Sequence, residues 1–225
     1  MQIAVLGTGM VGKAIANKLA SLGHEVLMGT RDPQQTLNKE KDGKKDFQEW
    51  YNEQQGIQLL SFESSAQQAA LIINCTSGMA SLKALQAAGA DNLAGKTIID
   101  IANPLDFSQG MPPSLNPVNT NSLGEQIQAA FPKSKVVKTL NTMSVYLMIE
   151  PSNLNGDHNV FVSGNDENAK AETNSLLHEL GWRPEQIIDL GDITTARGTE
   201  MLLPIWLRLR GTLGTAEFNF HIQRN

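Results

Sequence analysis

Three glycines near the start of the chain have a spacing that suits phosphate binding. Residues 7–12 read Gly-Thr-Gly-Met-Val-Gly and directly follow an apolar run at residues 3–6. In such a turn the first glycine permits a tight bend, the second lets the backbone approach a pyrophosphate, and the third lets the next helix pack on the strand. Backbone N–H groups at the helix start would bind the phosphates. We therefore expect a dinucleotide site that contains Gly7, Thr8, Gly9, Met10, Val11 and Gly12.

The end of the second apolar run bears on which dinucleotide binds. Residues 28–33 read Met-Gly-Thr-Arg-Asp-Pro, so Gly29 or Thr30 stands where an acidic residue would bind the ribose hydroxyls of NAD(H). The guanidinium of Arg31 can bind a 2′-phosphate through paired, charge-assisted hydrogen bonds, and Thr30 can add a donor. We expect NADP(H) rather than NAD(H). The alternative is that Arg31 and Asp32 form a surface turn and Pro33 starts a helix.

Short apolar runs predict the elements that position these residues. Seven strands are expected at residues 3–6, 25–28, 71–75, 97–101, 136–140, 159–163 and 187–190. Helices are expected at residues 12–22, 81–88, 123–130 and 167–180. The runs are nearly continuous rather than alternating, which is typical of strands buried on both faces of a parallel sheet. We predict an α/β fold: a Rossmann-type, doubly wound, mostly parallel sheet with a C-terminal helix.

Two segments interrupt this alternation. Residues 38–46 are almost wholly polar and predict a solvated loop or helix end, with the alternative that Lys39 or Lys41 lies near a cofactor phosphate. Residues 109–121 contain three prolines and predict a surface loop, of a length that is often functional.

The C-terminal residues predict a helix with one apolar face. Between residues 196 and 222 this face would contain Leu202, Ile205, Trp206, Leu209 and Leu213. We expect residues 1–195 to form an NADP-binding domain. Residues 196–225 would pack on that domain or on the partner of a homodimer, and the sequence leaves both open.

Composition and charge exclude several classes of function. The net charge of -5 disfavours a nucleic-acid partner, and one cysteine, Cys75, excludes a disulfide framework and fits the cytoplasm. No run approaches the length of a membrane span, and no signal peptide is visible. The four histidines lack metal-ligand spacing, so we expect no metal site. Short-chain dehydrogenases use a tyrosine followed by a lysine four residues later, and this chain lacks that pair. Gln55 stands four residues after Tyr51, and Glu150 stands four residues after Tyr146.

Several segments together resemble one known family. They are residues 3–12, 23–26, 29–33, 100–104, 137–143 and 161–166, together with a C-terminal helix that contains Trp206. Over nearly its whole length the chain resembles the NADP oxidoreductases that depend on coenzyme F-420, a deazaflavin. These motifs are specific for the fold and the dinucleotide. They are less specific for the second substrate, because relatives include flavin-handling and ferric-reductase domains.

The resemblance implies roles for loops that follow the strands. Residues 8–11 would line the pyrophosphate, and Thr30 and Arg31 would bind the 2′-phosphate. Further implied contacts are Cys75, Thr76 and Ser77 beside the nicotinamide ribose, Asn103 and Pro104 beside the nicotinamide, and Asn141, Thr142 and Met143 beside the second substrate. Other interpretations are that Cys75 is a small buried residue, that residues 103–104 form an ordinary turn, and that residues 141–143 only pack.

The expected chemistry is hydride transfer between NADP(H) and a flavin-like or deazaflavin acceptor. Such transfer needs two rings held in contact and does not require an acid–base pair, whereas carbonyl reduction usually needs a proton donor. Tyr146 is a lone candidate donor, more readily explained by packing or a rim position. The alternatives are a non-catalytic NADP(H) sensor, or a reductase of a small carbonyl, imine or ferric substrate.

Overall fold

Within the residues that the computed structural model describes, 1–40 and 45–224, eight strands form one sheet. They are β1 (Gln2–Leu6), β2 (Glu25–Thr30), β3 (Ile57–Ser61), β4 (Leu71–Asn74), β5 (Thr97–Asp100), β8 (Lys135–Thr139), β9 (Val160–Gly164) and β10 (Ile187–Asp189). Their order across the sheet is β10-β9-β8-β5-β4-β1-β2-β3. All neighbours are parallel except β8 and β9, so β9 and β10 run opposite to the other strands. The predicted doubly wound, mostly parallel sheet is confirmed.

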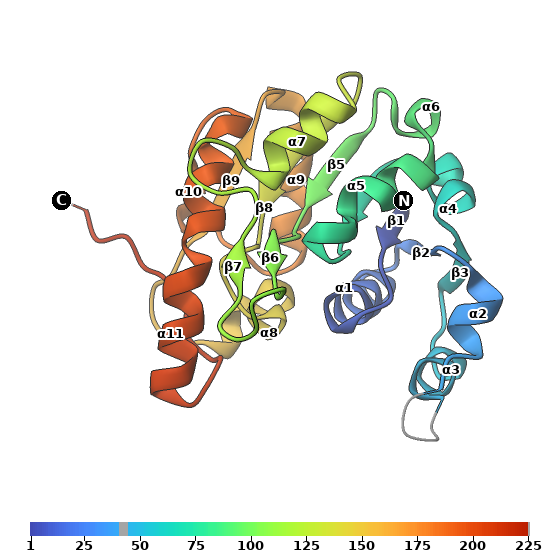
Figure 1. The fold of residues 1–225 in the computed structure, drawn as a ribbon, viewed down its shortest axis with the longest axis horizontal. Helices are drawn as coiled ribbons and strands as arrows, with labels where there is room; N and C mark the ends of the chain where they lie inside the picture. The colour runs from blue at the N-terminus through green and yellow to red at the C-terminus, as the bar shows by residue number, and fades with distance from the viewer. Residues whose placement is uncertain (41–44, 225) are drawn as a thin grey trace.

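Helices cover both faces of the sheet. They are α1 (Met10–Ser21), α2 (Pro33–Leu37), α3 (Asp46–Asn52), α4 (Phe62–Gln68), α5 (Gly78–Ala88), α6 (Ala90–Leu93), α7 (Leu123–Ala130), α8 (Val145–Ile149), α9 (Glu167–Glu179), α10 (Ala196–Met201) and α11 (Leu203–Leu213). Single 3-10 turns lie at Pro151–Asn153, Pro184–Gln186 and Ile193–Thr195. The short strands β6 (Leu105–Asp106) and β7 (Ser114–Leu115) pair as a hairpin beside the sheet. Figure 1 shows α10 and α11 at the β9 side of the molecule.

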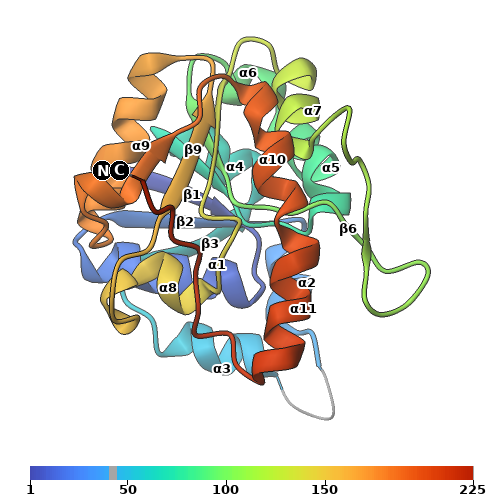
Figure 2. The same ribbon diagram turned by 90° about the vertical axis from the view of Figure 1, so that its left-hand side faces the viewer.

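Alternation along the strands produces two cores. Ile3 and Val5 face the core that contains α1, α8 and α9, whereas Ala4 and Leu6 face the core of α4–α7 and α10. Figure 2 shows α1 and α8 on one side of β1 and β2, with α4 and α5 on the other. Because helices cover both faces, side chains on both faces of the central strands are buried, and these strands are continuous apolar runs in the sequence. The sequence could therefore predict them although apolar and polar residues do not alternate along them.

Of the eight strands of the main sheet, β3 was not predicted from the sequence, and neither was α4, the helix that follows it. Strand β3 lies at the edge of the sheet, and α4 follows it directly. An edge strand needs fewer apolar residues than a central one, and Gln58 is exposed while Ser61 caps α4 through its hydroxyl. The segment 57–61 therefore lacked the continuous apolar pattern of the other strands.

The predicted C-terminal helix is present, but it is divided in two, and its apolar stripe is only partly buried. The segment forms two helices, α10 and α11, which meet at Leu202 just before Pro204. Leu203 and Trp206 are buried, whereas Ile205 and Leu213 are 47% and 55% exposed. Pro204 lies in the first turn of α11, where proline is tolerated, and it starts the new helix. Whether the exposed part of the stripe packs on a partner stays a prediction.

The polar and proline-rich segments are largely at the surface. Lys39 is exposed, and Lys41 lies outside the described residues. Most side chains of residues 109–121 are exposed, although β7 within this segment pairs with β6. In the described part of the chain, no helix has the length and apolar character needed to cross a membrane.

Candidate active site

The glycine turn between β1 and α1 has a distinct geometry at each glycine. Gly7 has φ +118°, and a Cβ there would lie 2.7 Å from the carbonyl oxygen of Cys75. A Cβ on Gly12 would overlap the carbonyl oxygen of Gly7. A Cβ on Gly9 would meet no atom within 4 Å, so space is open at this position alone of the three. Tight packing at Gly7 and Gly12 thus fixes the turn, and Gly9 leaves room for a ligand.

The first turn of α1 offers unpaired backbone donors at this open space. Gly9 is the N-cap of α1 and supplies no capping side chain, and the first turn contains no acidic residue. The N–H groups of the first helical residues have no acceptor within the helix, and the helix dipole adds positive potential. This arrangement suits a pyrophosphate.

At the end of β2, Pro33 starts a helix, as one of the two interpretations of residues 30–33 expected. Asp32 caps α2, which begins at Pro33, and its carboxylate accepts a hydrogen bond of 2.9 Å from the Gln35 N–H. The Thr30 hydroxyl is buried and lies 2.8 Å from that of Thr36. Arg31 is exposed and has no ion-pair partner among the described residues. Because Asp32 is engaged by the helix, the Arg31 guanidinium is available to an anionic ligand.

The loop after β4 lies directly beside the glycine turn. The Cys75 N–H donates to the Leu6 carbonyl at 2.9 Å, and the Thr76 hydroxyl donates to the Asn74 side chain at 2.7 Å. Burial, with a further contribution from the negative charge of Asp100, raises the pKa of the Cys75 thiol. The thiol is therefore neutral and a poor nucleophile, which favours the interpretation of Cys75 as a small packing residue.

The loops after β5 and β8 are held to each other by two amides. The Asn103 side chain donates to the Asn141 carbonyl at 2.8 Å, and the Asn141 side chain donates to the Asn103 side chain at 3.0 Å. Leu140, which precedes Asn141, has φ +61°, a left-handed conformation that is costly for a branched residue. This sharp bend follows the end of β8 and precedes the contact between the two loops.

A buried cluster of charges, which sequence analysis missed, lies behind these loops. The Lys138 ammonium is fully buried and lies 2.8 Å from both the Asp100 and the Glu200 carboxylates. It also donates to the Ala102 carbonyl. Burial by itself would lower the pKa of Lys138, but the two carboxylates outweigh burial and raise its pKa. The lysine is therefore charged and fully hydrogen-bonded.

This cluster connects three parts of the site. Asp100 accepts a 2.8 Å bond from Asn74, which in turn orients Thr76. Glu200, on α10, accepts bonds from the N–H groups of Leu123 and Gly124 at the start of α7. The loops after β4 and β5 are thus tied to the C-terminal helices through buried polar groups. The sequence signal was a lysine inside an apolar run, which is rare unless the lysine is paired.

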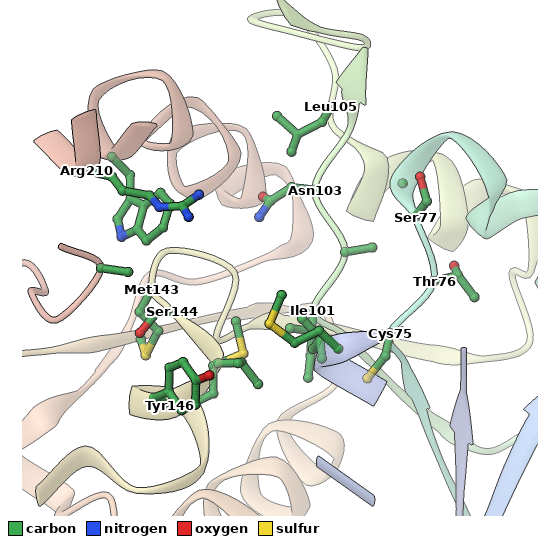
Figure 3. A pocket seen from close by; sticks show the side chains of 18 of the residues that line it. Cys75, Thr76, Ser77, Ile101, Asn103, Leu105, Met143, Ser144, Tyr146 and Arg210 are labelled. Atoms are coloured by element: carbon green, nitrogen blue, oxygen red, sulfur yellow. The ribbon is translucent and has the colours of Figure 1, made fainter. Parts of the chain in front are cut away.

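A cavity of about 710 Å³ lies in front of this network. Its lining is formed by Met10, Val11, Cys75, Thr76, Ser77, Gly78, Ile101, Ala102, Asn103, Leu105, Phe107, Met143, Ser144, Val145, Tyr146, Met148, Trp206, Arg210 and Ala216. Figure 3 shows Cys75 and Ser77 on one side, Met143 and Tyr146 on another, and the guanidinium of Arg210 pointing across toward Asn103. The volume falls in the range of small-molecule sites.

The lining is mostly apolar and has one ionised side chain, Arg210. None of the lining residues is His, Asp, Glu or Lys, so the cavity contains no acid–base pair of the usual kind. Tyr146 is 61% exposed and lies at the rim. The arrangement can hold a flat apolar ligand against another ring, with an anion near Arg210.

The structure brings some of the predicted site residues together and separates others. Met10, Val11, Cys75, Thr76, Ser77, Asn103 and Met143 all line the cavity. Pro104, Asn141 and Thr142 do not line it and are buried. Thr30 and Arg31 lie farther along the sheet edge, beyond the glycine turn. Their contacts with a cofactor stay predictions.

The C-terminal contribution to the cavity was also missed. Arg210 and Ala216 come from the end of the chain, and no local pattern connects them to loops a hundred residues earlier. Trp206 was expected on a docking face, and it does pack, stacking on Phe218 at 5.4 Å between ring centroids.

A protein family and a solved structure are similar to this chain. The model of a family described as NADP oxidoreductase, coenzyme F-420-dependent, matches residues 2–104. A crystal structure from Arthrobacter sp. FB24, of a protein provisionally assigned as an F-420-dependent NADP reductase, is 60% identical over 100% of both chains, with a TM-score of 0.96.

More distant relatives are similar in part. Metalloreductase STEAP3 of Rattus norvegicus is 24% identical over 91% of this chain, which spans 38% of the length of that protein. An imine reductase from Aspergillus terreus has a TM-score of 0.60 at 18% identity, covering 95% of this chain and 61% of its own. The last likeness concerns the fold alone.

Proposed function

The chain belongs to the family of NADP oxidoreductases that depend on coenzyme F-420, and on this premise we propose that it transfers hydride between NADP(H) and a flavin-like or deazaflavin acceptor. It is an NADP-dependent oxidoreductase. The proposed acceptor is supported mainly by the cavity of about 710 Å³. This cavity extends from the start of α1 to α11 and lacks an acid–base pair.

The order of the strands supports an extended NADP(H) along the carboxyl edge of the sheet. Neighbouring strands β2, β1, β4 and β5 would contact the 2′-phosphate, the pyrophosphate and the nicotinamide in turn. Arg31 and Thr30 follow β2, the open space at Gly9 follows β1, and residues 75–77 and Asn103 follow β4 and β5. Ligands of open α/β sheets bind at this edge, where the strand order reverses between β1 and β4.

The rest of the cavity is left for the second substrate. Its walls after β8 and on α11 include Met143, Tyr146 and Trp206, which are broad and mainly apolar. A flat heterocycle could stack there against the nicotinamide, with Asn103 at the boundary. Such walls exclude water and favour the ring contact that hydride transfer needs.

The residues of this chain would act by positioning. When bound, the nicotinamide supplies or accepts the hydride. The amides of the α1 turn and Arg31 would hold the phosphates, and the paired amides of Asn103 and Asn141 would fix the loop beside the ring. The neutral Cys75 thiol would not compete as a nucleophile. Reduction of a flavin-like ring needs no protein acid at the carbon or nitrogen that receives hydride.

Steady-state oxidation of NADPH, followed at the nicotinamide absorbance, tests the proposal. The acceptors are coenzyme F-420, FMN, a ferric chelate and a cyclic imine. We expect turnover with F-420 or FMN and a lower rate with the other two. Turnover confined to the ferric chelate or to the imine would instead assign that substrate class. Tight NADPH binding without turnover of any acceptor would contradict the proposed hydride transfer and favour a sensor.

A further inference from the structure

The C-terminal helix α11 presents Arg210 at the far end of the cavity and Arg208 in the hollow beside it, and the proposed binding of NADP(H) uses neither arginine. We propose that Arg210, assisted by Arg208, binds the anionic tail of the second substrate in a groove beside α11. This inference rests on the proposed function, because it assumes that the acceptor ring occupies the cavity. It adds the residues that would distinguish acceptors with an anionic side chain from acceptors without one.

Helical spacing links the cavity to the groove. Trp206 and Arg210 are four residues apart on α11, so they lie on one face, and both line the cavity. A second hollow of about 630 Å³ lies along the adjacent face, between α11 and the tip of the β6–β7 hairpin at Met111 and Pro112. Arg210 lines both spaces, and Arg208 lines only the second. A ligand could therefore pass from one to the other beside the Arg210 guanidinium.

The electrostatics of the two spaces favour an anion. Neither lining contains an acidic residue, and the groove contains two arginines. Both arginines are exposed, and neither has an ion-pair partner among the described residues. The whole chain has a net charge of -5, so this unbalanced positive charge is local. Guanidinium groups bind phosphate and carboxylate oxygens through paired hydrogen bonds.

The position along the sheet assigns this anion to the acceptor. Arg31, the residue expected to bind the NADP 2′-phosphate, follows β2, whereas the cavity wall nearest α11 follows β8. Three strands, β1, β4 and β5, lie between them, so β2 and β8 are about 19 Å apart at the usual strand spacing. The pyrophosphate turn lies between these ends. An anion at Arg210 therefore lies beyond the nicotinamide, on the side of the second substrate.

Matched acceptors that differ by one charged tail provide the test. FMN and riboflavin share a ring, and coenzyme F-420 can be compared with its deazariboflavin core, which lacks the phosphodiester tail. Arg210→Met should raise the KM for FMN and F-420 about tenfold, the lower end expected for a charged hydrogen bond at an exposed site. The KM values for riboflavin and the deazariboflavin core should change less than about twofold. In the wild type, added salt should weaken the binding of acceptors with an anionic tail more than the binding of acceptors without one.

A control and a second readout separate this inference from the proposed function. Lys133→Met removes an exposed cation at the amino end of β8, whereas the cavity lies at the carboxyl end. This variant should leave all KM values unchanged. Fluorescence titration of FMN and riboflavin into the protein saturated with NADP⁺ measures binding without turnover. Loss of the FMN preference in Arg210→Met supports the inference even where turnover fails.

Three results would overturn it. Equal effects of Arg210→Met on tailed and untailed acceptors would remove Arg210 from tail binding. A higher KM for NADPH in this variant would assign the arginine to the nicotinamide cofactor. A lower molar mass in light scattering, together with unchanged FMN preference, would assign the groove to a second copy of the chain.

Discussion

Arg31 and Lys138 are both cations at the carboxyl half of the sheet, but their surroundings differ. Arg31 is exposed and has no acidic partner among the described residues, whereas Lys138 is buried between Asp100 and Glu200. An exposed, unpaired guanidinium can bind a ligand at little cost in stability. A buried ammonium cannot leave its partners, so it holds structure instead.

Arg31→Ala should weaken NADPH binding much more than NADH binding. Loss of one charged hydrogen bond to the 2′-phosphate predicts a rise in the NADPH dissociation constant of about tenfold or more. Isothermal titration of both cofactors measures this difference. NADPH should also raise the melting temperature of the wild type more than NADH does, and this excess should vanish in the variant. Equal losses for the two cofactors would exclude Arg31 from the phosphate site. Lys133→Ala, which removes an exposed cation at the amino end of β8, serves as the control.

Lys138→Met should destabilise the fold strongly. Removal of the ammonium leaves the Asp100 and Glu200 carboxylates buried without a counter-charge, and such a loss costs about 3–5 kcal/mol. Lys135→Met on the same strand removes an exposed ion pair with Asp166, 3.3 Å long, and should cost at most about 1 kcal/mol. Denaturant unfolding measures both variants. Similar free energies of unfolding for the two would show that the buried cluster is not stabilising.

Among the elements, the turn between β1 and α1 contains glycines with two different roles: some allow close backbone packing, and one leaves room for a ligand. Gly12 packs against Gly7, and Gly9 faces open space. The elements at the other end of the site behave differently, because Pro204 breaks the C-terminal segment into α10 and α11. Glu200, before the break, lies 2.8 Å from Lys138, and Trp206 and Arg210, after the break, line the cavity.

The two glycines should therefore respond differently to substitution. Gly12→Ala should lower the free energy of unfolding by roughly 1–3 kcal/mol, because the added methyl overlaps backbone that cannot move freely. Gly9→Ser should leave stability nearly unchanged, since serine is a good N-cap, yet weaken NADPH binding about tenfold or more by filling the phosphate space. Thermal unfolding and cofactor titration of each variant give both quantities. A stable Gly12→Ala variant, or a Gly9→Ser variant with normal affinity, would contradict this division.

At the scale of the whole molecule, the chain after α11 returns to the sheet and packs beside β9 and the cavity wall. Figure 2 shows this segment running from the end of α11 past α8 toward β9. Asn159 donates its N–H to the Phe220 carbonyl at 2.8 Å, and the Asn219 amide lies 3.0 Å from His158 Nδ1 and 3.9 Å from Met143 Sδ. The C-terminal segment thus contacts a residue of the cavity wall.

This return segment should make stability depend on pH. Burial lowers the pKa of His158, which also faces Asp157, Arg183 and His221. The unfolded chain therefore binds a proton at a higher pH than the folded chain, and stability should fall as the pH decreases below about 6.5. Protonated Nδ1 would face the Asn219 amide donor. Unfolding free energies at about pH 7 and about pH 5.5 should differ less in His158→Gln than in the wild type. An unchanged difference would exclude His158.

Association and location stay predictions at this scale. Ile205 and Leu213 expose apolar surface on α11, which is compatible with the expected homodimer. Light scattering measures the molar mass. The expected cytoplasmic location has its own test in cell fractionation.

Local chemistry was enough to predict much of this protein from the sequence. The seven apolar runs all became strands, and the glycine turn, the helix at Pro33 and the position of Arg31 depend on residues a few positions apart. Backbone dihedral preferences and apolar periodicity act over that range, so they can be read along the chain. The order and direction of β9 and β10 were not predicted, because strand pairing joins distant segments.

Only the tertiary structure decided which side chains share a space. Lys138 meets Asp100, 38 residues away, and Glu200 across the sheet; Arg210 reaches the loops after β5 and β8 from the end of the chain. These contacts depend on the sheet order and on the break before Pro204. The proline is visible in the sequence, but the sheet order leaves no local pattern, because strand pairing joins segments that are far apart in the chain. The glycine turn was therefore visible in the sequence, whereas the cavity beside it was not.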